Sequence, residues 1–245
     1  MIGLIDLNYV RSSMPREQQS SEFLNYLAKC ENGEGQVARM PSLNALSDQL
    51  DISVSRLREQ LEVARALGLV EVKPRTGIRR QPYTFAPAVK QSLFYAINLD
   101  RAYFERFSEL RAHVEASFWY EAVESLTAED KAALRDLLSS AWMKLNGEPV
   151  EIPQVEHREL HLLIYRRLNN PFVQGVLEAY WEAYEAVGLN VYADYQYLRQ
   201  VWSYHERMVD AICAEDYEAG YQALIEHTGL IYRRPNAQTV TEERT

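Results

Sequence analysis

Along the first third of the chain, apolar residues recur every three or four positions, which is typical of short amphipathic helices. The segment 18–33 carries such a stripe and ends at Gly33, and a shorter apolar stripe follows Ser42. A tight turn at 50–52 separates this shorter segment from a further helix, for which Ser53 offers an N-terminal cap. The pattern predicts three helices, of which the last two are joined by a turn.

After Gly68 the helical period gives way to the alternation of a strand at 69–72, and a second short strand at 78–80 follows a turn at 74–77. Helix, short helix, turn, helix and a two-stranded wing is the order of elements in a winged helix-turn-helix domain. We therefore expect such a DNA-binding domain over residues 10–82.

The rest of the chain has helical periodicity throughout 91–235. Residues 83–90, which include Pro87, are expected to form a linker, and the polar residues 236–245 a flexible tail. The sequence thus predicts a mainly α protein, with an N-terminal winged helix-turn-helix followed by an all-helical bundle. The expected helices span about 88–123, 127–145, 153–168, 171–190, 193–214 and 216–234.

Composition narrows the class of protein. Hydrophobic residues make up 47% of the 245 residues, which excludes a disordered chain, and no apolar run is long enough to span a membrane. The first dozen residues lack the basic start and cleavage site of a signal peptide. Cys30 and Cys213 form no CxxC pair, so we expect free thiols in a reducing cytoplasm.

The net charge of −9 is distributed unevenly along the chain. Residues 1–82 hold 11 Lys and Arg against 10 Asp and Glu, whereas residues 83–245 hold 15 against 25. Residues 54–80 include seven basic residues and only three acidic ones. This asymmetry indicates two domains, of which the first carries a local basic patch.

Polar and basic side chains at the start of the second helix of the motif, and on the wing, are what a protein needs to bind the major groove and the phosphates beside it. They are Ser53, Ser55, Arg56 and Arg58 on the helix and Arg75, Arg79 and Arg80 on the wing. A solvated surface on a protein-interaction module would carry similar charges, so the residues alone leave both interpretations open.

The same segment resembles the GntR family of bacterial transcription regulators over about 40 residues. The matching stretches are Met40-Pro41-Ser42, Ile52-Ser53, Leu57-Arg58-Glu59-Gln60-Leu61, Gly68-Leu69-Val70 and Pro74-Arg75-Thr76-Gly77. The resemblance implies DNA contacts at Ser42, Asn44, Ser53, Ser55, Arg56, Arg58, Arg75, Thr76 and Gly77. The family's usual glutamate–arginine pair is Leu43-Asn44 here, and Val54 replaces an arginine, so the family's operator sequence does not carry over.

All five histidines lie in the helical part of the chain. They are His113, His157, His161, His205 and His227. His157 and His161 are four residues apart on one expected helix, so their imidazoles share a face at a spacing that suits one metal ion. Histidines of a core or a surface would fit this spacing equally well.

The helical part resembles the FCD-like effector domain of the FadR-type branch of the GntR family over about 140 residues. His161, Asn170-Pro171, His205 and His227 follow the order of that branch, and His157 stands where it usually has aspartate. The resemblance implies a metal site made of the four histidines, whose nitrogen donors favour Zn²⁺ or Ni²⁺. The alternative is a site that has lost its metal and uses the histidines as polar groups of a cavity.

Arg111 matches an arginine that commonly faces the effector cavity in that branch. A buried guanidinium needs a carboxylate partner, which is either Glu115, four residues on, or the acid group of a ligand. Aromatic residues also crowd this part, as in a core or a pocket; if they line the cavity, the effector is larger or more apolar than a simple acid. They are Trp119, Tyr165, Tyr180, Trp181, Tyr184, Tyr197, Trp202 and Tyr204.

We therefore expect a cytoplasmic, homodimeric transcription factor, not an enzyme, that binds palindromic operator DNA and responds to a small carboxylate bound beside Zn²⁺ or Ni²⁺. A dimer is expected because two DNA-binding domains must meet half-sites one helical turn apart. Three rivals stay open: a metal-dependent helical enzyme fused to a DNA-binding module, a purely structural DNA-binding protein, and a regulator with an apolar, metal-independent effector. Against the enzyme, the sequence has no HExxH and no nucleophile motif.

Overall fold

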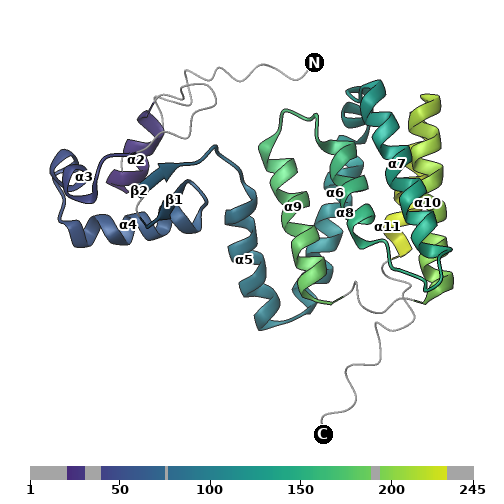
Figure 1. The fold of residues 1–245 in the computed structure, drawn as a ribbon, viewed down its shortest axis with the longest axis horizontal. Helices are drawn as coiled ribbons and strands as arrows, with labels where there is room; N and C mark the ends of the chain where they lie inside the picture. Colours follow the sequence, from purple (N-terminus) through teal and green to yellow (C-terminus); the bar gives the residue numbers. More distant parts are fainter. Residues whose placement is uncertain (1–20, 31–39, 75–76, 189–193, 231–245) are drawn as a thin grey trace, which may run out of the picture. The chain divides into compact units, whose positions relative to one another are not determined.

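The computed structural model describes residues 21–30, 40–74, 77–188 and 194–230 (Figure 1). The chain forms two compact units, Met1–Tyr83 and Thr84–Thr245. Within the described residues, no helix is both long enough and apolar enough to cross a bilayer.

The described part of the first unit contains three short helices and a two-stranded sheet, as the sequence predicts. Its elements are α2 (Glu22–Lys29), α3 (Leu43–Leu50), α4 (Val54–Ala66), β1 (Val70–Lys73) and β2 (Gly77–Arg80). The hydroxyls of Ser42 and Ser53 accept hydrogen bonds from backbone N–H groups in the first turns of α3 and α4. Asp51 adopts a left-handed conformation (φ 52°), which makes the tight turn between these two helices.

β1 and β2 pair as an antiparallel hairpin, with Val70 opposite Arg80 and Lys73 opposite Gly77. The hairpin and the three helices share one apolar core, because each element places its periodic apolar residues inward. The buried members of this core are Phe23, Leu27, Leu46, Leu57, Leu61, Ala64, Val70 and Ile78. The winged helix-turn-helix arrangement of this unit is therefore confirmed.

Seven helices make up the described part of the second unit (Figure 1). They are α5 (Ala86–Leu99), α6 (Ala102–Glu124), α7 (Ala128–Leu145), α8 (Gln154–Tyr165), α9 (Pro171–Ala186), α10 (Tyr195–Ala214) and α11 (Tyr217–Thr228). α10 packs against α7 and α11, α8 lies among α6, α7 and α9, and α5 packs along α9 and α6. The all-helical bundle predicted for this part is confirmed.

Two sequence predictions about the start of this unit are wrong. The single helix expected over 88–123 is two helices, since Asp100 is extended and its carboxylate accepts a hydrogen bond from the N–H of Ala102 at 2.9 Å. The expected linker 83–90 contains the first turn of α5, because proline is tolerated at the start of a helix and Pro87 lies there. α7 and α10 end at the predicted residues, whereas α8 and α9 end three to four residues earlier than predicted. The predicted end of the last helix, at residue 234, lies outside the described residues.

Gly175 on α9 permits a close approach between α9 and the start of α5. A Cβ atom at this position would lie 2.7 Å from the backbone nitrogen of Ala86 and 2.7 Å from the Cβ of Phe85. No side chain larger than hydrogen fits there unless the two helices separate. The start of α5 is therefore held directly against the backbone of α9.

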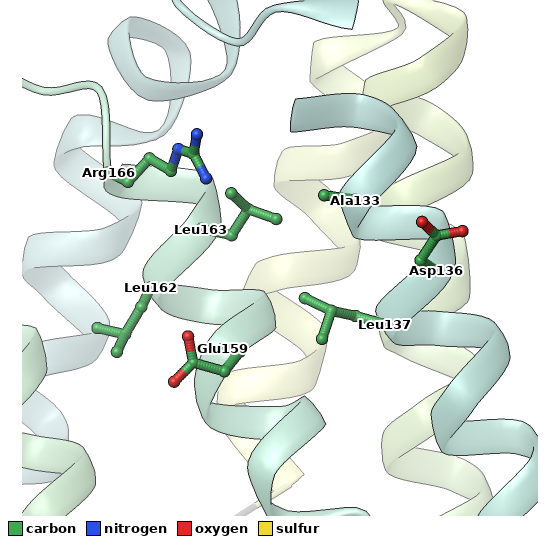
Figure 2. A pocket seen from close by; sticks show the side chains of 7 residues that line it. All are labelled: Ala133, Asp136, Leu137, Glu159, Leu162, Leu163 and Arg166. Carbon is green, nitrogen blue, oxygen red and sulfur yellow. The ribbon is translucent and has the colours of Figure 1, made fainter. Parts of the chain in front are cut away.

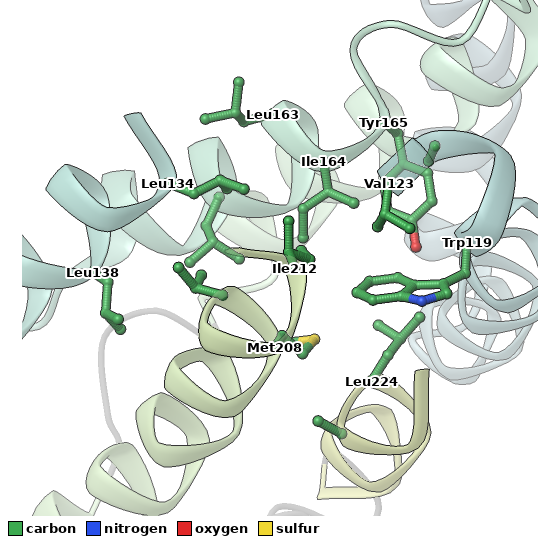
Figure 3. Packing of buried hydrophobic residues seen from close by; sticks show 14 of the residues in the cluster. Trp119, Val123, Leu134, Leu138, Leu163, Ile164, Tyr165, Met208, Ile212 and Leu224 are labelled. Carbon is green, nitrogen blue, oxygen red and sulfur yellow. The ribbon is translucent and has the colours of Figure 1, made fainter. Parts of the chain in front are cut away.

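Trp119 on α6 is one of the two tryptophans of the bundle core and is fully buried. Figure 3 shows it together with Leu224 from α11, Ile164 from α8 and Ile212 from α10. Its indole N–H donates a hydrogen bond of 2.9 Å to the carbonyl of Tyr217. Trp119 therefore joins α6 to α11 by a hydrogen bond and by close packing against Gly220.

A buried carboxylate fixes the start of α7. Asp130 accepts a hydrogen bond from the backbone N–H of Thr127, whose hydroxyl in turn caps the N–H of Asp130, a reciprocal capping box. Its two oxygens also contact the guanidinium groups of Arg167 and Arg166 after α8. The pKa of Asp130 is lowered to about 2, mainly by the hydrogen bond from Arg167 and to a smaller extent by the hydrogen bonds from Thr127.

Candidate metal centre and its surroundings

Three helices bring four of the five histidines together. His157 and His161 come from α8, His205 from α10 and His227 from α11. Each histidine offers a ring nitrogen, and the four nitrogens lie within 4.8 Å of one another. We call these four residues the histidine cluster. The fifth histidine, His113, is exposed on α6, where its Nδ1 contacts the carbonyl of Glu109.

The nitrogens of the histidine cluster are spaced as ligands of one ion would be. Nε2 of His161 lies 3.1 Å from Nε2 of His205 and 3.3 Å from Nε2 of His227. Two nitrogens that bind one tetrahedral Zn²⁺ at about 2.0–2.1 Å lie roughly 3.3 Å apart. The donor set therefore fits a transition-metal ion.

Burial keeps these imidazoles neutral, as a metal ligand must be. His161 and His205 are completely buried and His227 almost so. Desolvation lowers the pKa of each well below the usual histidine value, and the neighbouring Arg111 guanidinium lowers it further. Protons therefore compete weakly for the nitrogens, which leaves their lone pairs available.

Aromatic rings enclose the side of the histidine cluster formed by His157. This residue is half-buried, and its ring centroid lies 4.6 Å from that of Trp181 and 6.1 Å from those of Tyr184 and Trp202. Of the aromatic residues singled out in the sequence, these three are near the histidines. Trp202 is also a member of the apolar core, to which Trp119 and Tyr165 belong.

Arg111 lies beside the histidine cluster and is only 5% exposed. Its Nε is 2.8 Å from a carboxylate oxygen of Glu115, and one of its terminal nitrogens is 2.9 Å from Nδ1 of His161. The guanidinium stacks over Tyr180 at 4.7 Å and Trp181 at 5.4 Å from the ring centroids. The sequence leaves open whether the carboxylate partner of Arg111 is Glu115 or the acid group of a ligand. In the structure Arg111 is paired with Glu115.

The sequence indicates Glu115 only as a partner of Arg111, and the structure adds a second contact. The other carboxylate oxygen lies 3.0 Å from Nδ1 of His161, and Glu115 is fully buried. Burial raises the pKa of this carboxyl, while the charge of Arg111 acts in the opposite direction. Arg111, Glu115 and His161 form a buried triad next to the histidine cluster.

Apart from Arg56, the residues expected to contact DNA fall into three groups in the first unit. Asn44, Ser55 and Arg58 are exposed, and so is Gly77 at the start of β2. Ser42 and Ser53 use their hydroxyls as helix caps. Arg75 and Thr76 lie outside the described residues.

Two basic residues of this region have intramolecular partners. Arg56 is exposed and forms an ion pair with Glu22 of α2, a carboxylate that Gln60 also contacts. Arg80 donates a hydrogen bond of 2.7 Å to the carbonyl of Cys30, so it fastens the wing to the end of α2. Among the described residues, Arg56 and Arg65 of α4 form ion pairs and Arg58 forms none, so no carboxylate competes with DNA for Arg58.

A separate groove of about 500 Å³ lies between α7 and α8 (Figure 2). Apolar side chains form its floor, and three charged residues stand at its edges. The lining residues are Ala133, Asp136, Leu137, Glu159, Leu162, Leu163 and Arg166. None of the four clustered histidines lines this groove, so it is distinct from the candidate metal centre.

A winged helix-turn-helix unit followed by an all-helical unit with a buried histidine cluster is the architecture of a transcriptional regulator that has a separate effector domain. The chain belongs to the FCD domain family, whose model matches residues 107–229. Arg111, Glu115 and all four clustered histidines lie within this match. The expected membership of the GntR-type transcriptional regulators with an FCD domain is confirmed, and these similarities point to a regulator, not an enzyme.

Among curated proteins, the uncharacterized HTH-type transcriptional regulator YieP of Escherichia coli (strain K12) is 25% identical over 191 residues, which cover 75% of this chain and 80% of that protein. Among solved structures, Streptococcus agalactiae GntR aligns with a TM-score of 0.61 at 17% identity, covering 86% of this chain and 96% of that one. E. coli McbR/YncC covers 88% of this chain and 97% of its own, with a TM-score of 0.46 and 20% identity.

Proposed function

We propose that this regulator binds a palindromic operator as a homodimer, holds Zn²⁺ or Ni²⁺ in the histidine cluster, and responds to a small organic acid bound beside the metal. The observation that carries the proposal is the convergence of four histidine nitrogens within 4.8 Å inside an FCD domain. A protein with this role acts where the chromosome is, so we assign it to the cytoplasm.

His157, His161, His205 and His227 would hold the metal, and the charge on the ion would attract an anionic ligand. Four neutral imidazoles favour Zn²⁺ or Ni²⁺ over Mg²⁺ or Ca²⁺, which prefer oxygen donors. Because the imidazoles carry no charge, the ion would keep its full positive charge in a buried site. A carboxylate is the ligand that best compensates such a charge.

Arg111 is the residue of this chain that we assign to the effector. Its guanidinium lies over the rings of Tyr180 and Trp181, which restrict the directions in which it can donate hydrogen bonds. Fixed, charged donors bind carboxylates in preference to neutral ligands. The pair with Glu115 offsets part of the charge on Arg111, and this makes the metal a necessary part of the anion site.

Metal content is the direct test of this proposal. The wild-type chain, expressed with added zinc and nickel and then dialysed, should carry about one first-row metal ion per chain by elemental analysis. His205→Ala should lose it, because one of four ligands is removed, whereas His113→Ala should keep it, since His113 is exposed and away from the cluster. Wild-type protein that takes up no metal would contradict the proposal.

A second candidate effector is an apolar, metal-independent ligand, favoured by the rings of Trp181, Tyr184 and Trp202 beside His157. Thermal-shift measurements on metal-loaded and chelated protein separate the two candidates. Stabilisation by carboxylates that disappears after chelation supports the organic acid. Stabilisation by uncharged compounds that survives chelation supports the apolar ligand and contradicts the metal-dependent one.

A further inference from the structure

One ring nitrogen of His161 has two neighbours with opposite requirements. Nδ1 lies 2.9 Å from a terminal nitrogen of Arg111 and 3.0 Å from a carboxylate oxygen of Glu115. A guanidinium only donates hydrogen bonds, whereas a carboxylate only accepts them. In a neutral imidazole, Nδ1 either carries the proton or has a free lone pair, so it satisfies one neighbour at a time.

The choice made at Nδ1 determines the state of Nε2. If Arg111 donates to Nδ1, the proton of the neutral ring is on Nε2, which then has no lone pair for a metal. If Nδ1 carries the proton and donates to Glu115, the lone pair is on Nε2, which points at His205 and His227. The two tautomers have the same charge and differ in their capacity to bind a metal.

His161 differs in this respect from its neighbours. The Nδ1 atoms of His205 and His227 are buried and have no hydrogen-bond partner among the described residues. Of these three histidines, only His161 has charged protein groups in contact with its Nδ1 atom. A carboxylate that holds the outer nitrogen of a metal-binding histidine also strengthens the ligand.

We infer that Arg111 and Glu115 compete for Nδ1 of His161, so that metal binding selects the contact with Glu115 and releases an N–H of Arg111 to a carboxylate ligand. This inference rests on the proposed metal site. It makes Glu115 a positioning residue for the metal and links the two ligands of the domain.

The link follows from the burial of Arg111. Arg111 is only 5% exposed, so an N–H group that it no longer donates to His161 has little access to water. An anion that accepts a hydrogen bond from this N–H group is therefore favoured. By the same step, an anion that draws Arg111 away from His161 leaves Nδ1 to Glu115 and prepares Nε2 for the metal. Each ligand therefore strengthens the binding of the other by the same factor.

The first measurement is the Zn²⁺ affinity of the full-length chain, by competition with a chromophoric chelator. Glu115→Gln should weaken Zn²⁺ binding about 10- to 100-fold, the usual effect of removing a carboxylate behind a metal-binding histidine. The matched control is Glu156→Gln, which removes another buried, ion-paired carboxylate whose partners are Lys144 and Ser140. The control should bind Zn²⁺ as the wild type does. Equal affinities in wild type and Glu115→Gln would overturn the inference.

The second measurement tests the link itself, with acetate as the carboxylate probe. In the wild type, acetate should raise the Zn²⁺ affinity and Zn²⁺ should raise the acetate affinity by an equal factor. Arg111→Lys keeps a positive charge beside Glu115 and lacks the second nitrogen that reaches His161. This variant should bind Zn²⁺ at least as tightly as the wild type. It should also lose most of the coupling between acetate binding and Zn²⁺ binding. Coupling that persists undiminished in Arg111→Lys would overturn the role of Arg111.

The third measurement needs no metal. Long-range ¹H–¹⁵N spectra of histidine-labelled, metal-free protein report which ring nitrogen of His161 carries the proton. Glu115→Gln should increase the Nε2–H form and Arg111→Lys the Nδ1–H form; an unchanged tautomer in both variants would overturn the inference. Wild-type protein that binds no Zn²⁺ would instead contradict the proposed metal site, so the two failures are distinguishable.

Discussion

The two units of this chain use their polar residues in opposite ways. In the first unit, the candidate DNA-binding residues Asn44, Ser55 and Arg58 are exposed and lie within one short stretch of sequence. In the second, the histidine cluster and Arg111 are mostly buried, and they come from four helices distributed over more than half of the unit. A surface site depends on local structure, whereas a buried site depends on the packing of the whole bundle.

The largest expected difference between the two units is the response to a mutation in the bundle core, which should lower stability and leave DNA binding nearly unchanged. Trp119→Ala should lower the free energy of unfolding by about 3–5 kcal/mol, because it leaves a large cavity among several helices. Operator affinity, measured at a temperature where the variant is folded, should stay within a few-fold of the wild type. Urea unfolding followed by circular dichroism measures the loss.

Tyr103→Ala is the control for this change, since Tyr103 is on the same helix and 40% exposed. It should cost less than about 1 kcal/mol. An equal loss of stability in both variants would contradict the assignment of Trp119 to the core.

A somewhat smaller effect is expected at the recognition helix. The test uses an operator that the wild-type protein has selected from random DNA. Arg58→Ala should weaken binding to this operator by about 1–3 kcal/mol, because a base or phosphate contact is lost. Stability should be unchanged, because Arg58 is exposed. Fluorescence anisotropy at physiological salt measures the affinity.

Arg65→Ala provides the matched control on α4. Arg65 is in the last turn of the helix and is paired with Glu62, so its removal should leave operator affinity nearly unchanged. If Arg58→Ala also binds with wild-type affinity, α4 is not the element that binds DNA.

Acidic pH should act on the second unit through Asp130. Because the folded-state pKa of Asp130 is about 2, below the usual 3.8, its carboxylate stabilises the fold above pH 3.8, and this contribution disappears as the pH falls toward 2. Asp130→Asn should therefore cost about 1–3 kcal/mol at neutral pH and much less near pH 2. Urea titrations at several pH values measure the difference, with the exposed Asp136→Asn as control. An equal cost at both extremes would show that the ion pairs with Arg166 and Arg167 contribute nothing.

The smallest effect is expected where the first unit pairs its own charges. Glu22→Gln should change stability by less than about 1 kcal/mol, because the ion pair with Arg56 is exposed. It should also tighten DNA binding up to about fivefold and steepen its salt dependence, since Arg56 becomes available to phosphate. Anisotropy titrations at two salt concentrations measure both quantities. Weaker DNA binding would mean that Glu22 orients Arg56 instead of competing for it.

Much of the first unit could be predicted from its sequence because its signals are local. Ser42, Ser53 and Gly68 mark helix ends within a few residues of the positions they control. The break at Asp100 was missed because aspartate in a helical pattern is a weak stop signal, and only its hydrogen bond to Ala102 shows that a new helix begins. The ion pair between Arg56 and Glu22 joins two helices and leaves no periodic trace.

The sequence, with the family resemblance, predicts which histidines form the candidate metal centre. It does not predict which other side chains contact them. The four-residue spacing of His157 and His161 places two imidazoles on one face, and the resemblance to a known family supplied His205 and His227. No spacing indicates that Glu115, 46 residues before His161, lies against one of its nitrogens. The i, i+4 relation between Arg111 and Glu115 was the available signal, because a buried pair on one helix still needs further partners.

The close approach at Gly175 has a mechanical consequence. Backbone meets backbone there, with no flexible side chain between α9 and the start of α5 to absorb a displacement. α9 also carries Tyr180 and Trp181, the rings on which Arg111 lies. A shift of α9 by even a fraction of an ångström therefore moves Phe85 and Ala86 with it, and these residues directly follow the point at which the chain leaves the first unit.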